Sequence, residues 1–231
     1  MITALVTGAN KGIGLEFCRQ LAARGDKVLA ACRRTSPELR ALPARVLEGI
    51  EMTSDEAIGR LARELAGTRL DWLVLNAGVF DSGGLGELDF GRMRHEYDVD
   101  ALGPLRVTQA LLPNLPSGAR IAIVSSRAGS IGDNTSGGNY GYCMAKAALN
   151  MAGVSLARDL ASRGVAVVML HPGVVDTDLF RAGRRALGRL VQSADTVTPQ
   201  VAVRDMLPRI DELTLEASGR FLHRNGSVLP W

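Results

Sequence analysis

A tyrosine and a lysine stand four residues apart, as Tyr142 and Lys146, in a stretch of helical composition. Residues four apart on a helix share one face, so the lysine ammonium can lie beside the phenol and favour its ionised form. A phenol with an ordinary pKa of about 10 then moves toward the range in which it exchanges a proton near neutral pH. Such a pair alone usually marks a solvated helix face, so its meaning depends on the rest of the chain.

A glycine-rich turn near the N-terminus is the second candidate for chemistry. It follows an apolar run with the composition of a strand and has the spacing Gly8-x-x-x-Gly12-x-Gly14. Glycines let the backbone approach a pyrophosphate closely, and free N–H groups at the start of the next helix point at the anion. The spacing differs from the commonest dinucleotide-binding turn, Gly-x-Gly-x-x-Gly, so the segment could also be a simple turn between a strand and a helix.

The composition limits the class of protein. A chain of 231 residues, 46% of them hydrophobic, suits one α/β domain with a buried core, and it has no apolar run long enough to cross a bilayer. The first predicted strand follows the N-terminus directly, which leaves no room for a signal peptide, so we expect a cytoplasmic protein. A net charge of +3, from 27 basic and 24 acidic residues, does not indicate a nucleic-acid partner. Three cysteines without metal-ligand spacing predict free thiols and no metal site: Cys18, Cys32 and Cys143.

Apolar runs alternate with helical patterns along the chain, which indicates repeated βαβ units and a parallel sheet. The predicted strands are Thr3–Thr7, Lys27–Ala31, Arg45–Glu48, Trp72–Leu75, Arg120–Val124, Ala166–Leu170 and Arg220–Leu222. The predicted helices are Gly14–Arg24, Ser54–Ala66, Pro104–Leu112 and Tyr142–Arg163, with a short one after Thr35. Ligands of such sheets bind beyond the carboxyl ends of the strands. The residues that follow four of these strands are therefore expected on one rim: Gly8, Asn76, Ser126 and Pro172.

Five motifs occur together in a fixed order. They are Thr7-Gly8-x-x-x-Gly12-Ile13-Gly14, Asn76-Ala77-Gly78, Ser126, Tyr142-x-x-x-Lys146, and Pro172-Gly173 with Thr177. Through these motifs, the chain resembles the short-chain dehydrogenase/reductase family over nearly its whole length. Three segments, 129–138, 146–151 and 218–231, resemble the C-factor and sniffer-type carbonyl reductase branch of that family. The resemblance implies an α/β fold with a Rossmann-type, doubly wound parallel sheet of about seven strands, in a single NAD(P)-binding domain over residues 1–231.

The same resemblance implies reduction of a carbonyl, in a ketone, aldehyde or quinone, to an alcohol. Tyr142 would donate the proton, Ser126 would donate a hydrogen bond to the carbonyl oxygen, and Lys146 would hold the nicotinamide ribose and lower the pKa of Tyr142. Ser126 is preferred over Ser125, which is predicted to be structural, because Ser-x-x-Gly matches the family pattern. The implied cofactor-binding residues are Thr7, Gly8, Asn10, Lys11, Gly12, Ile13, Gly14, Arg33, Glu51, Met52, Asn76, Ala77, Gly78, Tyr142, Lys146, Pro172, Gly173, Val175 and Thr177.

The cofactor form follows from charge. An acidic residue at the end of the second strand would bind the ribose hydroxyls of NAD and repel a 2′-phosphate, and none is present there. Arg33 follows that strand and Lys11 lies in the glycine turn, and a guanidinium can pair with phosphate through two hydrogen bonds. We therefore expect NADP(H), although both cations could be ordinary surface residues. Glu51, where the family usually has aspartate beside the adenine, is a mild departure.

One departure bears on the chemistry. Asp100 stands where the family carries an asparagine that bends its helix and anchors a water leading to the lysine. An ionised aspartate accepts hydrogen bonds but cannot donate them. If it lies near Lys146 it should raise the pKa of Tyr142, and if it is turned away it only caps or bends its helix. The departure leaves open a second class of function, an NADPH-binding sensor or signalling protein with little turnover.

The substrate pocket is predicted from the loops after the fourth, fifth and sixth strands. Its expected residues are mostly apolar, as in small-molecule pockets, and do not select one carbonyl substrate: Phe80, Leu85, Ile131, Tyr140, Val174, Leu179 and Phe180. The arginine-rich segment 180–189 is a candidate lid that attracts anionic substrates, with a solvated helix face as the alternative. By family resemblance we expect a homodimer or homotetramer that pairs through the helices predicted over 104–112 and 142–163.

Overall fold

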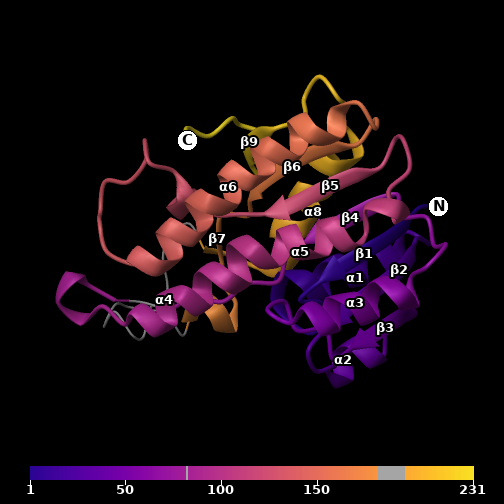
Figure 1. The fold of residues 1–231 in the computed structure, drawn as a ribbon, viewed down its shortest axis with the longest axis horizontal. Coiled ribbons are helices and arrows are strands. Elements are labelled where there is room, and N and C mark those ends of the chain that lie inside the picture. Colours follow the sequence, from indigo (N-terminus) through magenta and orange to yellow (C-terminus); the bar gives the residue numbers. More distant parts are fainter. Residues whose placement is uncertain (82, 182–195) are drawn as a thin grey trace.

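Seven parallel strands form the main sheet of the computed structural model, which describes residues 1–81, 83–181 and 196–231 (Figure 1). They run in the order β3-β2-β1-β4-β5-β6-β9. Their bounds are β1 Thr3–Thr7, β2 Lys27–Cys32, β3 Ala44–Glu48, β4 Trp72–Leu75, β5 Arg120–Val124, β6 Ala166–His171 and β9 Arg220–His223. A second, two-stranded sheet pairs β7 Val174–Val175 with β8 Thr196–Val197. The order reverses direction at β1 and β4, and ligands of open α/β sheets bind at this switch.

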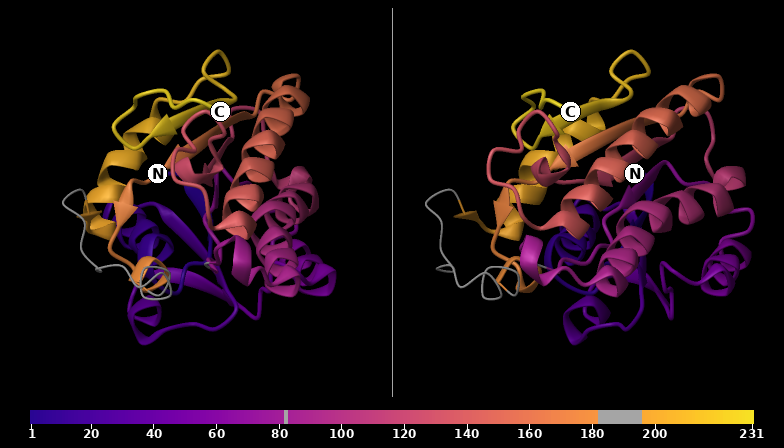
Figure 2. Two further views of the ribbon diagram at one scale, coloured as in Figure 1. Left: turned by 90° about the vertical axis from the view of Figure 1, so that its left-hand side faces the viewer. Right: turned by 60° about the vertical axis from the view of Figure 1, so that its left-hand side comes forward.

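The helices cover both faces of the sheet. They are α1 Gly12–Ala23, α2 Pro37–Arg40, α3 Asp55–Glu64, α4 Phe90–Tyr97, α5 Gly103–Ala110, α6 Tyr140–Ala161 and α8 Pro199–Asp211, and a π-helical turn over Asp98–Leu102 joins α4 to α5. Buried residues of α3, α5 and α6 share one apolar cluster with one face of the strands, and those of α1, α2 and α8 share the cluster on the other. Figure 2 shows the two layers, with α8 and α6 on opposite sides. The predicted single-domain α/β fold with about seven parallel strands is confirmed.

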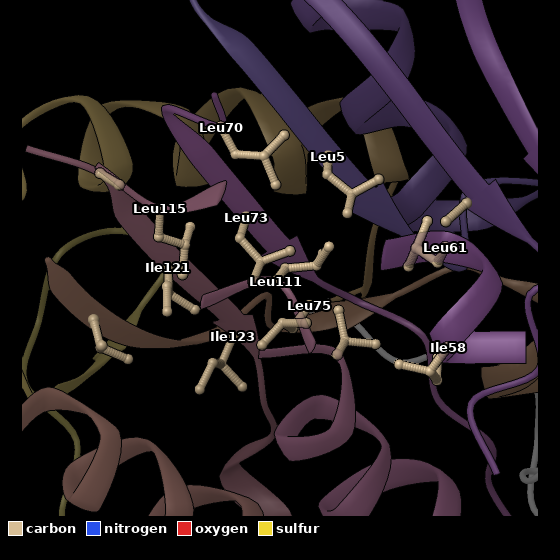
Figure 3. Packing of buried hydrophobic residues seen from close by; sticks show 14 of the residues in the cluster. Leu5, Ile58, Leu61, Leu70, Leu73, Leu75, Leu111, Leu115, Ile121 and Ile123 are labelled. Atoms are coloured by element: carbon tan, nitrogen blue, oxygen red, sulfur yellow. The ribbon is translucent and has the colours of Figure 1, made fainter. Parts of the chain in front are cut away.

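Alternation along the strands separates the two cores. Leu5 of β1 belongs to the cluster under α3 and α5, whereas its neighbours Ala4 and Val6 belong to the opposite cluster. Successive side chains of a strand point to opposite faces, so a strand buried on both sides reads as a continuous apolar run. Figure 3 shows Leu5, Leu73 and Ile121 of three neighbouring strands beside Leu111, which follows α5. This packing fixes the strand ends that carry the candidate site.

The predicted strands agree with the structure to within one residue at each end, and the predicted helices to within two. Two helices, α4 and α8, were not predicted. The segment of α4 is mostly polar and buries only Glu96 among its residues, so it lacks an apolar stripe. The segment of α8 contains Pro199 and Pro208, which read as chain breaks. Pro199 instead occupies the first turn, where a missing N–H costs nothing.

Candidate active site

The glycine turn adopts a conformation that requires glycine. Gly8 and Gly12 have φ of +65° and +56°, in the left-handed region that other residues seldom enter. A Cβ on Gly8 would lie 2.8 Å from Cα of Ala77, and a Cβ on Gly14 would overlap the carbonyl oxygen of Gly8. The turn therefore packs directly on the end of β4 and leads into α1.

Hydrogen bonds between β1 and β4 hold this turn in place. The Thr7 hydroxyl accepts from the N–H groups of Asn76 and Ala77 at 3.0 and 3.1 Å, and the Asn76 amide donates to the Thr7 carbonyl at 3.0 Å. Leu75, which precedes Asn76, is buried in the core. The hydrogen bonds with Thr7 therefore come from Asn76 and Ala77.

A cleft of about 720 Å³ opens over the carboxyl ends of these strands. Sixteen of the predicted cofactor residues line it, namely Thr7, Gly8, Asn10, Lys11, Gly12, Ile13, Arg33, Glu51, Met52, Asn76, Ala77, Gly78, Tyr142, Lys146, Pro172 and Thr177. Three others, Gly14, Gly173 and Val175, lie behind or beside this lining. Asp100, Ser125 and Leu179 also line the cleft. The structure thus brings the first, second, fourth and fifth sequence motifs to one cleft, whereas Ser126, the third, is not part of its lining.

Tyr142, Lys146 and Asp100 meet at the inner end of the cleft. The Lys146 Nζ lies 3.1 Å from Oδ2 of Asp100, and only 6% and 0% of these two side chains are exposed. The same Nζ lies 3.5 Å from the Val124 carbonyl oxygen and 5.6 Å from the centre of the Tyr142 ring. Asp100 therefore faces the lysine, and the alternative in which it is turned away is wrong.

The charge around the phenol differs from the sequence expectation. Burial raises the pKa of Tyr142, Asp100 raises it further, and the Lys146 ammonium and a hydrogen bond with Ser126 oppose the change without reversing it. Burial acts to lower the pKa of Lys146, but Asp100 and Tyr142 together raise it above its ordinary value. The lysine thus acts in the predicted direction, yet the prediction that the pKa of Tyr142 is lowered is wrong. The phenol is protonated at neutral pH and can act as an acid.

Ser125 and Ser126 have different hydrogen-bond partners, which distinguish their roles. The Ser125 hydroxyl donates to Oδ1 of Asn150 at 2.6 Å in the interior, a structural contact as predicted. The Ser126 hydroxyl accepts from the N–H of Ala128 at 3.1 Å and is hydrogen-bonded with Tyr142. Ser126 is therefore the serine that lies beside the phenol.

The predicted phosphate-reading cation lies at the outer end of the cleft. Nη1 of Arg33 is 3.4 Å from Oε2 of Glu51, and 62% of the Arg33 side chain is exposed. An exposed ion pair of this kind contributes little to stability. The pair places the guanidinium of Arg33 beside Glu51, and both residues line the cleft. Lys11 lines the same cleft from the glycine turn.

The predicted substrate-pocket residues are more dispersed. The Phe80 ring contacts the Tyr142 ring edge-on, with 4.7 Å between the centroids. Tyr140 instead lines a separate small cavity of about 40 Å³ with Glu96, Met93 and Gly141. Leu85 and Ile131 are exposed, and Val174 and Phe180 lie beyond the cleft lining. Most of the arginine-rich segment proposed as a lid, residues 182–189, lies outside the described residues.

The histidines and cysteines lack the setting of a catalytic acid or nucleophile, although Cys32 lines the cleft. Burial lowers the pKa of His171 to about 3, so its imidazole is neutral, and its ring lies 5.5 Å from that of His223. Burial raises the pKa of Cys18 to about 12, and Cys18, Cys32 and Cys143 are free thiols. The described residues contain no cluster of histidine, cysteine and carboxylate side chains able to hold a metal ion. In the same part of the chain, no helix is long and apolar enough to span a membrane.

Sequence reasoning missed Glu96. It is 2% exposed and lies beside the active-site lysine, one helical turn before Asp100. The available signal was a pair of acidic residues four apart, which on a helix share one face. That signal is weak, because α4 itself was not predicted.

Comparison with known proteins finds similar sequences and structures over the whole chain. Residues 2–187 match the family described as short chain dehydrogenase. The 1-hydroxy-2-glutathionyl-2-methyl-3-butene dehydrogenase of Rhodococcus sp. (strain AD45) is 42% identical over 235 aligned residues, which cover 100% of both chains. The C-signal protein of Myxococcus xanthus is 46% identical over 167 residues, which are 70% of this chain and 93% of that protein.

Two solved structures are similar over the full chain. The NADPH-bound carbonyl reductase from chicken fatty liver has a TM-score of 0.88 at 30% identity, covering 100% of this chain and 99% of the other. The carbonyl reductase Sniffer of D. melanogaster has a TM-score of 0.87 at 25% identity, covering 100% of both chains.

Proposed function

We propose that this chain, which belongs to the short-chain dehydrogenase family, reduces a carbonyl compound to an alcohol with NADPH. The predicted resemblance to the C-factor and sniffer-type branch is confirmed by the similarity to C-signal and Sniffer. The observation that carries the proposal is that one cleft is lined by Tyr142 and Lys146 and also by Arg33 and Lys11, with Ser126 hydrogen-bonded to Tyr142. The proposed proton donor, the lysine and the proposed phosphate-binding cations thus line the same cleft.

The residues of the cleft fit a dinucleotide. Gly8 and Gly14 leave no room for a Cβ, because the turn packs closely against Ala77 and Asn76 and against itself. The amides at the start of α1 suit an anion such as a pyrophosphate. No acidic residue ends β2, where NAD-specific proteins hold the ribose hydroxyls. Thr177 packs against Gly12 and would close the cleft over the cofactor.

When bound, NADPH supplies the hydride that the carbonyl carbon receives. The chain supplies the rest of the chemistry. The Tyr142 hydroxyl donates its proton to the carbonyl oxygen, and the Ser126 hydroxyl donates a hydrogen bond to that oxygen as its charge grows. Lys146 holds the ribose and stabilises the tyrosinate that remains, while Asp100 keeps the lysine protonated.

The direct test is a screen of ketones, aldehydes and quinones that follows NADPH absorbance, with NADH in parallel. Because the Rhodococcus relative is named for a glutathionyl alcohol, the panel includes glutathione conjugates that carry an aldehyde or hydroxyl group. NADPH consumption with at least one carbonyl supports the proposal. Its absence over the whole panel, in protein that binds NADPH, contradicts it.

The second candidate is an NADPH-binding sensor or signalling protein, which the similarity to C-signal favours. In that case the cofactor binds tightly and no compound in the panel is turned over. The presence of Ser126, Tyr142 and Lys146 in contact favours the enzyme, because binding alone does not require a positioned acid.

Replacing Arg33 and Lys11 together with alanine is expected to weaken NADPH binding by about 10- to 100-fold and NADH binding by less than about threefold. The reason is that a bidentate phosphate contact and a second cation are lost, and only NADPH carries the 2′-phosphate. Fluorescence titration of both cofactors measures the difference. Arg40→Ala is the control for loss of a nearby cation, because Arg40 is exposed and lies outside the cleft lining. An equal loss for NADPH and NADH would show that these residues do not read the phosphate.

We also propose a homodimer or homotetramer through α5 and α6. Met144 and Met151 on α6 are 58% and 68% exposed, and seven residues apart they share one face of the helix. Light scattering of the native protein and of Met144→Lys with Met151→Lys tests this. A native monomer would contradict it.

A further inference from the structure

Two buried carboxylates hold the segment that carries Phe80. Oδ1 of Asp100 accepts the N–H of Val79 at 2.8 Å, and Oε1 of Glu96 accepts the N–H of Asp81 at 2.6 Å. These are the two amides on either side of Phe80. The backbone of this segment is thus attached at both ends to one face of α4 and the π-helical turn after it.

Phe80 connects this attached segment to Tyr142, because the two side chains are in contact. The two rings pack edge-on with centroids 4.7 Å apart and an angle of 81° between their planes. Glu96 also touches the helix that carries the tyrosine, because a Cβ on Gly141 would overlap Oε2 of Glu96. One side chain therefore contacts both segments that determine where the phenol lies.

The setting of Glu96 makes this contact sensitive to protonation. Burial raises the pKa of Glu96 to about 7, and Asp100 and Asp81 raise it, while the Asp81 N–H and Lys146 favour the charged form. The groups that face it are Asp81 on the preceding segment, Asp100 on the π-helical turn, Cys143 and Lys146 on α6, and, around the small cavity, Glu87, Asp89, Arg92 and Tyr140. Among the described residues it forms no ion pair. It therefore changes charge in the range where the protein works.

We propose that Glu96 is a positioning residue that, when ionised, holds Phe80 against the ring of Tyr142 and, when protonated, releases it. The proposal rests on the proposed role of Tyr142 as proton donor. A carboxylate is a stronger acceptor for the Asp81 N–H than a neutral carboxyl group. Loss of the charge loosens the Val79–Asp81 segment, and the phenol then loses its lateral support next to the substrate.

The first measurement is the pH dependence of kcat/KM for carbonyl reduction between pH 6 and pH 8. In the native protein we expect a fall of about fivefold toward pH 6, the difference between a charged and a neutral hydrogen bond. Glu96→Gln keeps the size and one acceptor oxygen but cannot change charge, so its profile should be flat over this range. Glu87→Gln, an exposed carboxyl beside the same small cavity, should keep the native fall.

The second measurement does not depend on turnover. Hydrogen exchange of the Asp81 amide, with NADPH bound and corrected for the intrinsic pH dependence, should show about fivefold less protection at pH 6 than at pH 8. Glu96→Gln should remove that difference. The proposal is overturned if Glu96→Gln keeps the native fall in kcat/KM. It is also overturned if the protection of the Asp81 amide in the native protein does not change with pH. If no carbonyl is reduced, the proposed function fails, whereas pH-dependent Asp81 protection that Glu96→Gln abolishes still supports the restraint.

Discussion

Tyr142→Phe is expected to lower kcat for carbonyl reduction by about 10²- to 10⁴-fold, the usual contribution of a positioned acid, and to leave NADPH affinity within about threefold. Phenylalanine keeps the ring that packs against Phe80 and loses only the hydroxyl that lies beside Ser126. The structure around the site therefore survives while the proton donor is removed. Steady-state kinetics and a fluorescence titration of NADPH measure the two quantities separately.

Tyr140→Phe is the matched control. Tyr140 begins the same helix, lines a different cavity, and has Met144 rather than a lysine four residues later. We expect its kcat to stay within about threefold of the native value. Equal losses in the two variants, or full activity in Tyr142→Phe, would contradict the assignment of the acid.

Asp100→Asn is expected to move the alkaline-rising limb of alcohol oxidation to lower pH by about one unit, the size of shift that a nearby buried charge produces. Oxidation needs the ionised phenol as a base, and Asp100 raises the pKa of Tyr142. Removing that charge makes ionisation easier. Reduction near neutral pH uses the protonated phenol in both proteins, so it should change by less than about threefold. Rate profiles in both directions, from pH 6 to pH 11, test the shift.

Asparagine retains the structural contact of Asp100, since its side-chain oxygen can still accept the Val79 N–H. Asp98→Asn is the control, because Asp98 lies in the same π-helical turn but pairs with Arg106 at 2.6 Å on the partly exposed side. It should leave the oxidative limb in place. A limb that stays fixed or moves to higher pH in Asp100→Asn would refute the electrostatic account. Movement upward would indicate that Lys146 loses its own proton without Asp100.

The sheet and the rim of the cleft could be predicted from the sequence. Strands buried on both faces read as apolar runs, and a turn that needs left-handed φ at Gly8 and Gly12 selects glycine, so both are visible in local patterns. The ends of four strands then had to meet, because parallel strands end on one edge. Tyr142 and Lys146 were found from their spacing on one helix, and their place in the cleft follows from that helix starting beside the rim.

The charges of the site could not be predicted without the packed structure. The pKa of Tyr142 is raised because burial outweighs the lysine four residues away, and burial is a property of the packed protein rather than of sequence spacing. Likewise, Asp100 faces Lys146 across 46 residues of chain, and Glu96 reaches Asp81 and Gly141 from a helix too polar to predict. Such contacts join elements that local periodicity treats separately, so side-chain direction and burial become known only when those elements are packed together.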